Sequence, residues 1–335
     1  MKSYEYYLGI DVSKETLDVY VSKGKESVFH LCVSNDETGF KKLQSQLKKQ
    51  AIPVQKTLVC LEDTGYYGYP FAFWAADNTY DLWMESPVAI KKSLGLVRGK
   101  NDKVDARRIA LYAMRFQDEC KLWQPPRQVL LKLKSLVALR TRLITGKRRF
   151  SVPLKEKAYS LAKKEELEVI ACCNAALQGI EKSIKDTERK IDKLIRSDER
   201  LARMIKLITS IDGIGLQIAT ALIVATNEFQ HVKNGRKLAC YSGVVPFEHQ
   251  SGTSVRGRSR VSHLANKTLK SLLYMGVLSA IQNSDELRAY YQRKVAEGKS
   301  KLSVINAIKN KQILRIYACI RDNRIYEKNY TLKLA

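Results

Sequence analysis

Apolar and polar residues alternate along the first part of the chain, which is the pattern of half-buried strands. The alternation predicts three strands, at 6–11, 17–22 and 27–33, separated by short polar turns and joined as a meander. The period then changes to that of a helix at 36–49, and the apolar run 57–62 predicts a buried strand.

The next elements expected are a helix near 66–76, a strand at 80–84 and a helix that begins around Asp102. The order is therefore three strands, then helix, strand, helix, strand and helix. This is the ribonuclease-H-like layout, in which the first and fourth strands lie side by side. We expect an α/β domain over residues 1–125, ending at Pro125 and Pro126.

Beyond these prolines the pattern is mainly helical. Residues 126–205 are expected to form a basic helical segment, and the heptad-like spacing over 175–205 predicts a long helix or short coiled coil that serves as an arm or dimer contact. Residues 206–335 are expected to form a mainly helical C-terminal domain. The fold class expected for the whole chain is α/β plus all-α.

Charge narrows the class of partner. The chain of 335 residues has 59 Lys and Arg against 34 Asp and Glu, a net charge of +25, and a pI of about 9.7. A polyanion such as nucleic acid is the simplest partner for this excess. No apolar stretch is long enough to span a bilayer, and the N-terminus lacks the apolar segment of a signal peptide, so we expect a cytoplasmic protein with no membrane contact.

Four acidic residues are spaced as a metal site that acts on phosphodiesters would need them. Asp11 and Glu62 each end a run of strand-forming residues, while Asp102 and Asp105 are one helical turn apart. Hard carboxylate oxygens suit Mg2+. The alternative is that these residues only form turns or cap helices. The order of elements between them favours a shared site.

Three further segments are candidates for contact with nucleic acid. The helix expected over 130–150 is basic and contains no Asp or Glu, which favours phosphate contact over a merely solvated face. The glycines of Ser210–Ala219 read as a helix-hairpin-helix turn that binds a phosphate, although Gly-Ile-Gly also occurs in plain turns. The residues concerned are Arg140, Arg142, Lys147, Arg148, Arg149, Gly213 and Gly215.

The polar stretch 241–260 is expected to lie outside any core. Its glycines would expose the hydroxyl of Ser251, and Arg256, Arg258 and Arg260 could hold phosphates. The residues alone favour an ordinary basic loop, because no base stands next to this serine in the sequence.

The chain resembles the DEDD transposases of bacterial insertion sequences, the bridge-RNA-guided recombinases of the insertion sequence 110 type. The resemblance runs over nearly the whole chain and in the order of that family's landmarks. These are Gly9-Ile-Asp-Val-Ser, Glu62-Asp-Thr-Gly, Lys100-Asn-Asp-Lys-Val-Asp-Ala, Ile211-Asp-Gly-Ile-Gly and the stretch from Gly243-Val-Val-Pro to Gln250-Ser-Gly.

The resemblance implies a RuvC-like domain whose Asp11, Glu62, Asp102 and Asp105 bind Mg2+, with Mn2+ as a possible substitute. It also implies a nucleophilic serine, which maps best onto Ser251. The family often has a second glycine after the Ser-Gly pair, where this chain has Thr253, and Ser242 and Ser254 are close by.

The implied partners are donor and target double-stranded DNA, a structured bridge RNA, and further copies of the chain in a homodimer or homotetramer. The implied setting is the bacterial cytoplasm, in association with the nucleoid. Delegating sequence choice to base pairing would explain why no DNA-reading helix stands out.

Three alternatives stay open. A RuvC-like Holliday-junction resolvase would use the same carboxylates with water as the nucleophile. A sugar kinase or actin-like ATPase also opens with a Gly-Ile-Asp strand, but it needs glycine loops and an adenosine site that the sequence does not offer. A purely structural nucleic-acid-binding protein would not cut DNA at all.

Overall fold

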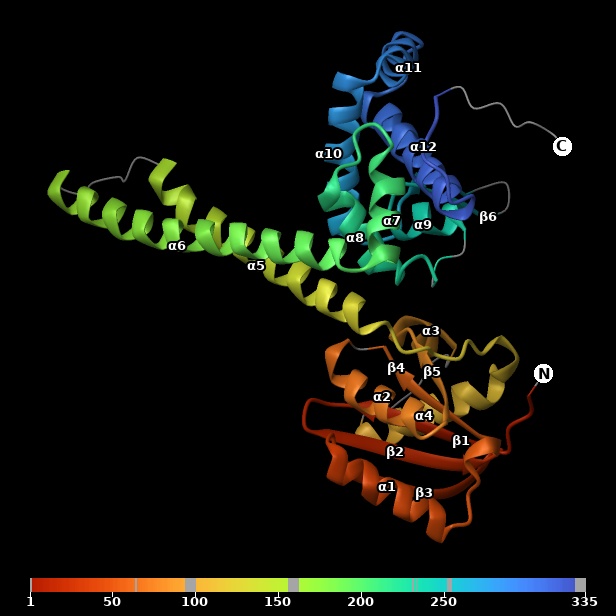
Figure 1. Ribbon diagram of the computed structural model, residues 1–335. Helices are drawn as coiled ribbons and strands as arrows, with labels where there is room; N and C mark the ends of the chain where they lie inside the picture. The colour runs from red at the N-terminus through yellow and green to blue at the C-terminus, as the bar shows by residue number, and fades with distance from the viewer. Residues whose placement is uncertain are drawn as a thin grey trace. The chain divides into compact units, whose positions relative to one another are not determined.

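The computed structural model divides the chain into two compact units, residues 1–125 and residues 126–335 (Figure 1). The residues described are 2–63, 65–93, 101–155, 163–230, 232, 234–251 and 255–328. For 153–155, 163–167, 247–251 and 255–260 the backbone alone is described.

A five-stranded mixed sheet forms the centre of the first unit. Its strands are β1 Tyr6–Val12, β2 Thr16–Lys23, β3 Glu26–Ser34, β4 Thr57–Glu62 and β5 Asp81–Glu85. They are arranged in the order β3-β2-β1-β4-β5, with β1 antiparallel to β2 and parallel to β4. The expected adjacency of the first and fourth strands is confirmed, since Ile10 pairs with Leu61.

Helices cover both faces of this sheet. They are α1 Glu37–Lys49, α2 Tyr69–Asp77, α3 Pro87–Ser93 and α4 Asp102–Arg115, with 3-10 turns at η1 Val54–Lys56, η2 Tyr66–Gly68 and η3 Gln117–Glu119. Alternate strand residues point to opposite faces. Ile10 and Leu61 accordingly pack with α1 and α2, whereas Cys60 packs with α4 on the other face.

The second unit is mainly helical. Its elements are α5 Gln128–Lys155, α6 Lys163–Arg196, α7 Glu199–Thr209, α8 Leu216–Thr226, α9 Gly235–Tyr241, β6 Phe247–Ser251, β7 Val255–Arg260, α10 Lys267–Asn283, α11 Asp285–Ala296 and α12 Lys301–Arg321. Helices α5 and α6 lie side by side as a long hairpin (Figure 1). Among the described residues no helix is long and apolar enough to cross a membrane.

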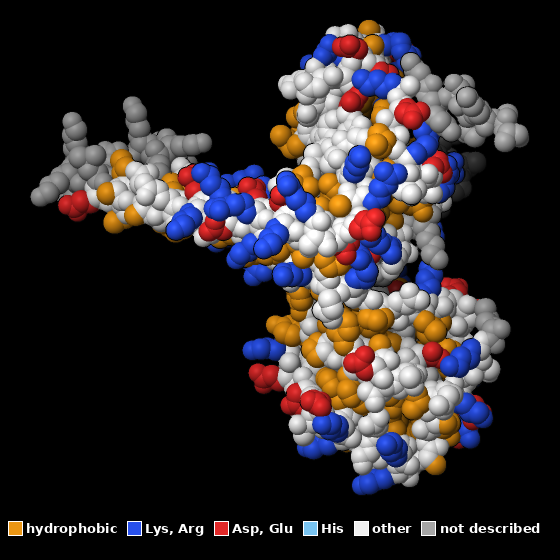
Figure 2. All heavy atoms as spheres, viewed as in Figure 1, with side chains coloured by type: hydrophobic (Ala, Val, Ile, Leu, Met, Phe, Trp, Pro, Cys, Tyr) orange, Lys and Arg blue, Asp and Glu red, His pale blue; other side chains and the backbone are white. Residues whose placement is uncertain are grey.

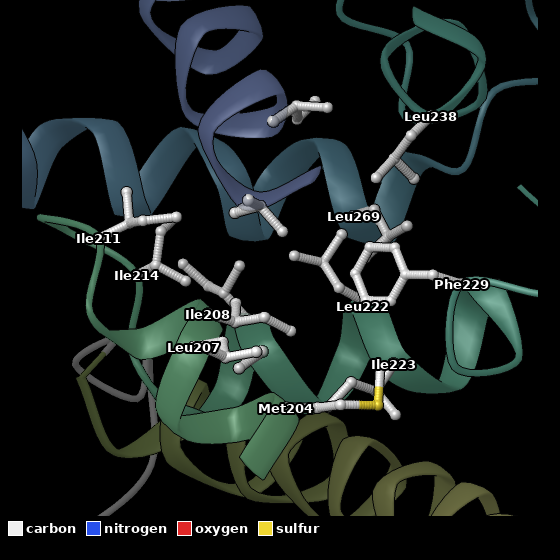
Figure 3. Close-up of a cluster of buried hydrophobic side chains, with 14 of the residues drawn as sticks. Met204, Leu207, Ile208, Ile211, Ile214, Leu222, Ile223, Phe229, Leu238 and Leu269 are labelled. Carbon is white, nitrogen blue, oxygen red and sulfur yellow. The ribbon is translucent and has the colours of Figure 1, made fainter. Parts of the chain in front are cut away.

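The core of this unit lies where α7, α8, α10 and α12 meet the ends of the α5–α6 hairpin. Leu207 and Ile208 of α7 point toward Leu222 of α8 and Leu269 of α10 (Figure 3). Leu133 of α5 is fully buried in the same cluster. The hairpin is therefore anchored in the core at one end.

An ion-pair network fixes the start of α5. Arg127 donates to Asp198 at 2.7 Å and also binds Glu228, whose side chain is 1% exposed. Glu228 lies in a run of three residues with left-handed backbone, with φ of 48°, 55° and 64° at 227–229. Its burial is tolerable because two arginines, Arg127 and Arg200, face it.

One expectation for this unit is partly right and another is wrong. The predicted long helix is confirmed up to Arg196, where α6 ends, but it does not continue to 205, because Asp198 caps a new helix by accepting a hydrogen bond from the N–H of Leu201 at 2.8 Å. The stretch 241–260 is not free of core residues, since Ser242 and Val244 are buried. Nor is it only a loop, since 247–251 and 255–260 pair as an antiparallel hairpin.

Candidate catalytic and nucleic-acid-binding sites

The four predicted carboxylates come from three elements that meet at one edge of the sheet in the first unit. Parallel strands bring their carboxyl ends to the same edge, and the pairing of Ile10 with Leu61 puts Asp11 beside Glu62. Asn101 caps α4 by accepting a hydrogen bond from the N–H of Val104 at 2.8 Å. This cap begins the helix at Asp102.

A close contact between β1 and α4 sets the spacing of the carboxylates. A Cβ on Gly9 would lie 2.1 Å from the carbonyl oxygen of Ala106 and 2.2 Å from the amide nitrogen of Ala110. Gly9 and Asp11 are two residues apart on a strand and share a face. The helix therefore touches β1 one step before Asp11, and its first turn, with Asp102 and Asp105, comes near that side chain.

The carboxylates lie within electrostatic range of one another. Burial raises the pKa of Asp11, and so do the negative charges of Asp105 and Asp102. Burial also raises the pKa of Glu62, together with the charges of Asp11 and Asp105. Crowded negative charges of this kind are stabilised by a nearby positive charge, which a bound cation would supply.

One cation of the protein does reach the cluster. Arg108 donates to Asp105, one turn earlier on α4, and both side chains are mostly buried. No three of the described His, Cys, Asp and Glu side chains lie close enough together to hold one metal ion. The donor atoms are thus of the right kind and within electrostatic reach of one another, but they are not gathered at ligand distance.

Two further acids line the same row of the sheet and were missed by the sequence reasoning. Asp18 on β2 pairs directly with Asp11, and Glu85 on β5 pairs with Glu62. The charge of Asp18 also raises the pKa of Asp11, and Asp18 forms a 2.9 Å contact with His30 Nε2. A polar residue inside the apolar run 17–21 was the available signal.

The candidate serine lies in the second unit. Ser251 ends β6 and pairs with Val255, so its backbone stands at the tip of the hairpin. Ser254 lies outside the described residues. Ser242 is fully buried, and its hydroxyl has no hydrogen-bond partner among the described residues, which makes it poorly placed to attack DNA. Arg256, Arg258 and Arg260 are alternate residues of β7, and their side chains lie outside the description.

The two glycines of the α7–α8 turn have different surroundings. Gly213 has φ +81°, and a Cβ there would lie 2.2 Å from the carbonyl oxygen of Gly276 on α10, so only glycine fits. Gly215 is exposed and begins α8 without a side-chain cap. The turn 209–215 and Ser279 line a shallow polar pocket at this helix N-terminus. Uncapped N–H groups at such a position favour an anion.

The basic residues of α5 fall into two groups. Arg140 pairs with Glu188 and Lys147 with Glu181, each at 2.7 Å, so these two charges join α5 to α6. Arg142, Arg148 and Arg149 are exposed and form no ion pair with a described carboxylate. The basic face of the single helix is thus partly matched by acids from its partner.

Positive charge is divided unequally between the units. Residues 1–125 contain 18 Lys and Arg against 16 Asp and Glu, whereas residues 126–335 contain 41 against 18. Figure 2 shows Lys and Arg side chains crowded along α5 and α6, in blue. The net charge is therefore +2 in the unit with the carboxylates and +23 in the other.

Comparison with known proteins gives two family matches and several long relatives. A model described as Transposase, of the IS110 DEDD type, matches residues 8–157. A model described as Transposase IS116/IS110/IS902 family matches residues 205–292.

The pilin gene-inverting protein of Moraxella bovis is 28% identical over 327 residues, which is 96% of this chain and 98% of that protein. Its namesake in Moraxella lacunata matches with the same identity and coverage. The transposase for insertion sequence element IS1111A of Coxiella burnetii is 26% identical over 254 residues, 68% of each chain.

Proposed function

This chain belongs to the IS110/IS116/IS902 family of transposases, and from that premise we propose that it is a Mg2+-dependent recombinase that cuts and rejoins donor and target DNA. Membership in the family makes it an enzyme of DNA transposition or recombination. The finer proposal concerns the residues, the metal and the guide.

The observation that carries the proposal is that four carboxylates lie at one edge of a RuvC-like sheet, within electrostatic range of one another. Asp11, Glu62, Asp102 and Asp105 would hold the metal, and Asp105 would share its charge between the metal and Arg108. When bound, Mg2+ or Mn2+ polarises the scissile phosphate and lowers the cost of developing negative charge. The raised pKa values of Asp11 and Glu62 support a site that is completed by a cation.

Ser251 is the proposed nucleophile. Its Oγ bonds to the scissile phosphorus while the bond from phosphorus to one DNA oxygen breaks, and that oxygen leaves as a hydroxyl after taking up the proton lost by the serine. The phosphoserine ester conserves the energy of the broken bond, so rejoining needs no ATP. The position of Ser251 at the hairpin tip and the burial of Ser242 support this assignment.

Nucleic acid is proposed to bind the second unit. The exposed arginines of α5 and the α7–α8 turn would contact phosphates of a structured guide RNA and of DNA, with Arg256, Arg258 and Arg260 near the serine. Because the serine and the carboxylates belong to different units, we propose that a homodimer or homotetramer assembles the complete site in the bacterial nucleoid. The charge of +23 on the second unit supports the phosphate contacts.

A second candidate function is inversion of a DNA segment by the same chemistry. It is favoured by the similarity to the pilin gene-inverting proteins, which extends over nearly the full length of both chains. A plasmid that carries two target sites in inverted orientation distinguishes the outcomes. Inversion reverses the orientation of the segment between the two sites, whereas transposition moves the segment to a second plasmid.

The decisive experiment uses a DNA substrate with a nick that prevents rejoining. With Mg2+, we expect a protein–DNA adduct on a denaturing gel, mapped to the peptide with Ser251, and no adduct from Ser251→Ala. Ser242→Ala and Ser254→Ala serve as controls and should still form it. An adduct that persists in Ser251→Ala would refute the assignment, and Mg2+-dependent cutting without any adduct would favour a resolvase that uses water.

The carboxylates are tested by Asp11→Asn. Mg2+ should raise the melting temperature of the wild-type protein. Asp11→Asn should abolish both this rise and the cutting of DNA. Without metal the variant should be at least as stable as wild type, because one crowded negative charge is gone. Near-normal cutting by Asp11→Asn would refute the metal site.

A further inference from the structure

Two tyrosines stand exposed on the surface immediately beyond the strand that ends at Glu62. Tyr66 is 59% exposed and Tyr67 is 50% exposed. Hydrophobic side chains are widely exposed on the visible face of this first unit (Figure 2). Aromatic side chains exposed within an apolar surface indicate a contact with a partner.

The tyrosines rest on a supported base of rings. The ring of Tyr66 meets that of Tyr69 edge to face, with centroids 6.4 Å apart. Tyr69 in turn contacts Phe73 and Trp123, which contact each other at 5.5 Å. These partly buried rings give the exposed ones a firm backing.

Hydrogen bonds tie this aromatic turn to the carboxylate edge. The side-chain amide Nδ2 of Asn35 donates to the carbonyl oxygen of Ser13 at 3.0 Å and to that of Tyr67 at 2.9 Å. Ser13 lies two residues after Asp11. Gly68 packs so closely on Leu61 that a Cβ would lie 3.2 Å from its side chain. The turn is thus fixed next to the segments that follow Asp11 and precede Glu62.

We propose that Tyr66 and Tyr67 stack on unpaired bases of the DNA strand beside the phosphodiester on which the carboxylates act. The inference rests on the proposed function, which makes DNA the substrate at this edge. Cutting and exchange of strands leave bases unpaired near the cut, and every base has a face that an aromatic ring can cover.

The charge of the first unit supports stacking as the means of holding the strand. With 18 basic against 16 acidic residues, and six of the acids at or beside the carboxylate row, this unit cannot hold a polyanion by charge alone. Base stacking does not depend on charge. Stacking therefore provides affinity for DNA next to an acidic site, where the charges of this surface provide none.

The test compares three double variants at Tyr66 and Tyr67, namely Phe–Phe, Leu–Leu and Ala–Ala. Binding is measured in metal-free buffer, by quenching of a 2-aminopurine base in a single-stranded DNA oligonucleotide. Stacking on an aromatic ring contributes enough that Ala–Ala should weaken binding roughly five- to 150-fold per base lost. Leu–Leu should lose nearly as much, while Phe–Phe should stay within about twofold of wild type, because it retains the rings.

The salt dependence provides a second readout. Loss of stacking should lower affinity without changing the slope of affinity against salt, because no phosphate contact is removed. Wild-type quenching and affinity in Ala–Ala would overturn the inference. Equal binding by Phe–Phe and Leu–Leu, together with a changed sedimentation of Ala–Ala, would also overturn it and would make the surface a contact between copies of the chain. A loss of binding confined to an RNA oligonucleotide of the same sequence would overturn it as well.

Failure of this inference is distinguishable from failure of the proposed function. The stacking assay needs neither metal nor cutting, and the nicked-substrate assay on the wild-type chain needs no variant of the tyrosines. A wild-type chain that forms the adduct while Ala–Ala binds DNA normally refutes only the stacking. A wild-type chain that never cuts refutes the proposed function.

Discussion

Replacement of Gly9 by alanine should disable the carboxylate site without touching any carboxylate. The new Cβ would stand 2.1 Å from the carbonyl oxygen of Ala106 and 2.2 Å from the amide nitrogen of Ala110. Both atoms belong to the backbone of α4, so no side chain can turn aside to make room. The helix itself must move away from β1.

The size of the effect follows from these distances. Ordinary contact begins near 3.4 Å, so α4 must retreat by about 1.3 Å, which carries Asp102 and Asp105 away from Asp11. Overpacking of this kind costs roughly 1–3 kcal/mol of unfolding free energy. A misplacement of about 1 Å in a catalytic group can lower the rate about 100-fold. Activity should therefore fall much further than stability.

Urea unfolding and Mg2+-dependent cutting of the nicked substrate measure the two effects side by side. Gly179→Ala is the matched control, because nothing lies within 4 Å of its added Cβ and alanine favours the helix interior, so it should be neutral or slightly stabilising. A Gly9→Ala chain that loses the expected stability but cuts DNA at the wild-type rate would refute the idea that this contact sets the spacing of the carboxylates.

Two further predictions concern the second unit. Changing Arg148 and Arg149 together to Ala should weaken binding of structured RNA and flatten its salt dependence, because two phosphate contacts are lost. Arg189 on α6 is ion-paired with Asp186, so the control variant Arg189→Ala should change the salt slope less. An unchanged salt slope in the double variant would place the RNA elsewhere. Arg127→Leu should lower the unfolding free energy by about 3 kcal/mol at neutral pH. The hydrogen bond from Arg127 lowers the pKa of Asp198, so this stabilisation is present above the ordinary aspartate pKa of about 4 and is lost as the pH falls through the lowered value. In urea unfolding from pH 7 to 3, the unfolding free energies of the wild type and Arg127→Leu should therefore converge. A constant difference between them would contradict the role of Asp198.

Sequence patterns were sufficient to predict the sheet of the first unit, because each strand carries its own alternation and the order of elements limits how they pair. The predicted pairing of the first and fourth strands is confirmed, and with it the approach of Asp11 and Glu62. Asp18 and Glu85 could not be placed in the same row, because that row depends on the register of strands distant in sequence.

The helical part was predicted less well, for physical reasons that particular residues show. The acids that match Arg140 and Lys147 come from α6, more than thirty residues later in the chain, so α5 alone looked uniformly basic. The strands at 247–251 and 255–260, which pair with each other, lack an apolar alternation that would have predicted them. The break before α7 had a signal in Asp198, a residue type that caps helices, inside an otherwise continuous heptad pattern.

The unequal division of charge has a consequence for incomplete copies of the protein. A chain that stops before residue 126, through a nonsense mutation or proteolysis, would carry all four carboxylates but a net charge of only +2. If the second unit binds nucleic acid as proposed, such a fragment would bind DNA weakly, because nearly all of the excess positive charge lies after residue 125. If the carboxylates cut DNA as proposed, a truncated copy that carries them would therefore pose little risk to the host chromosome.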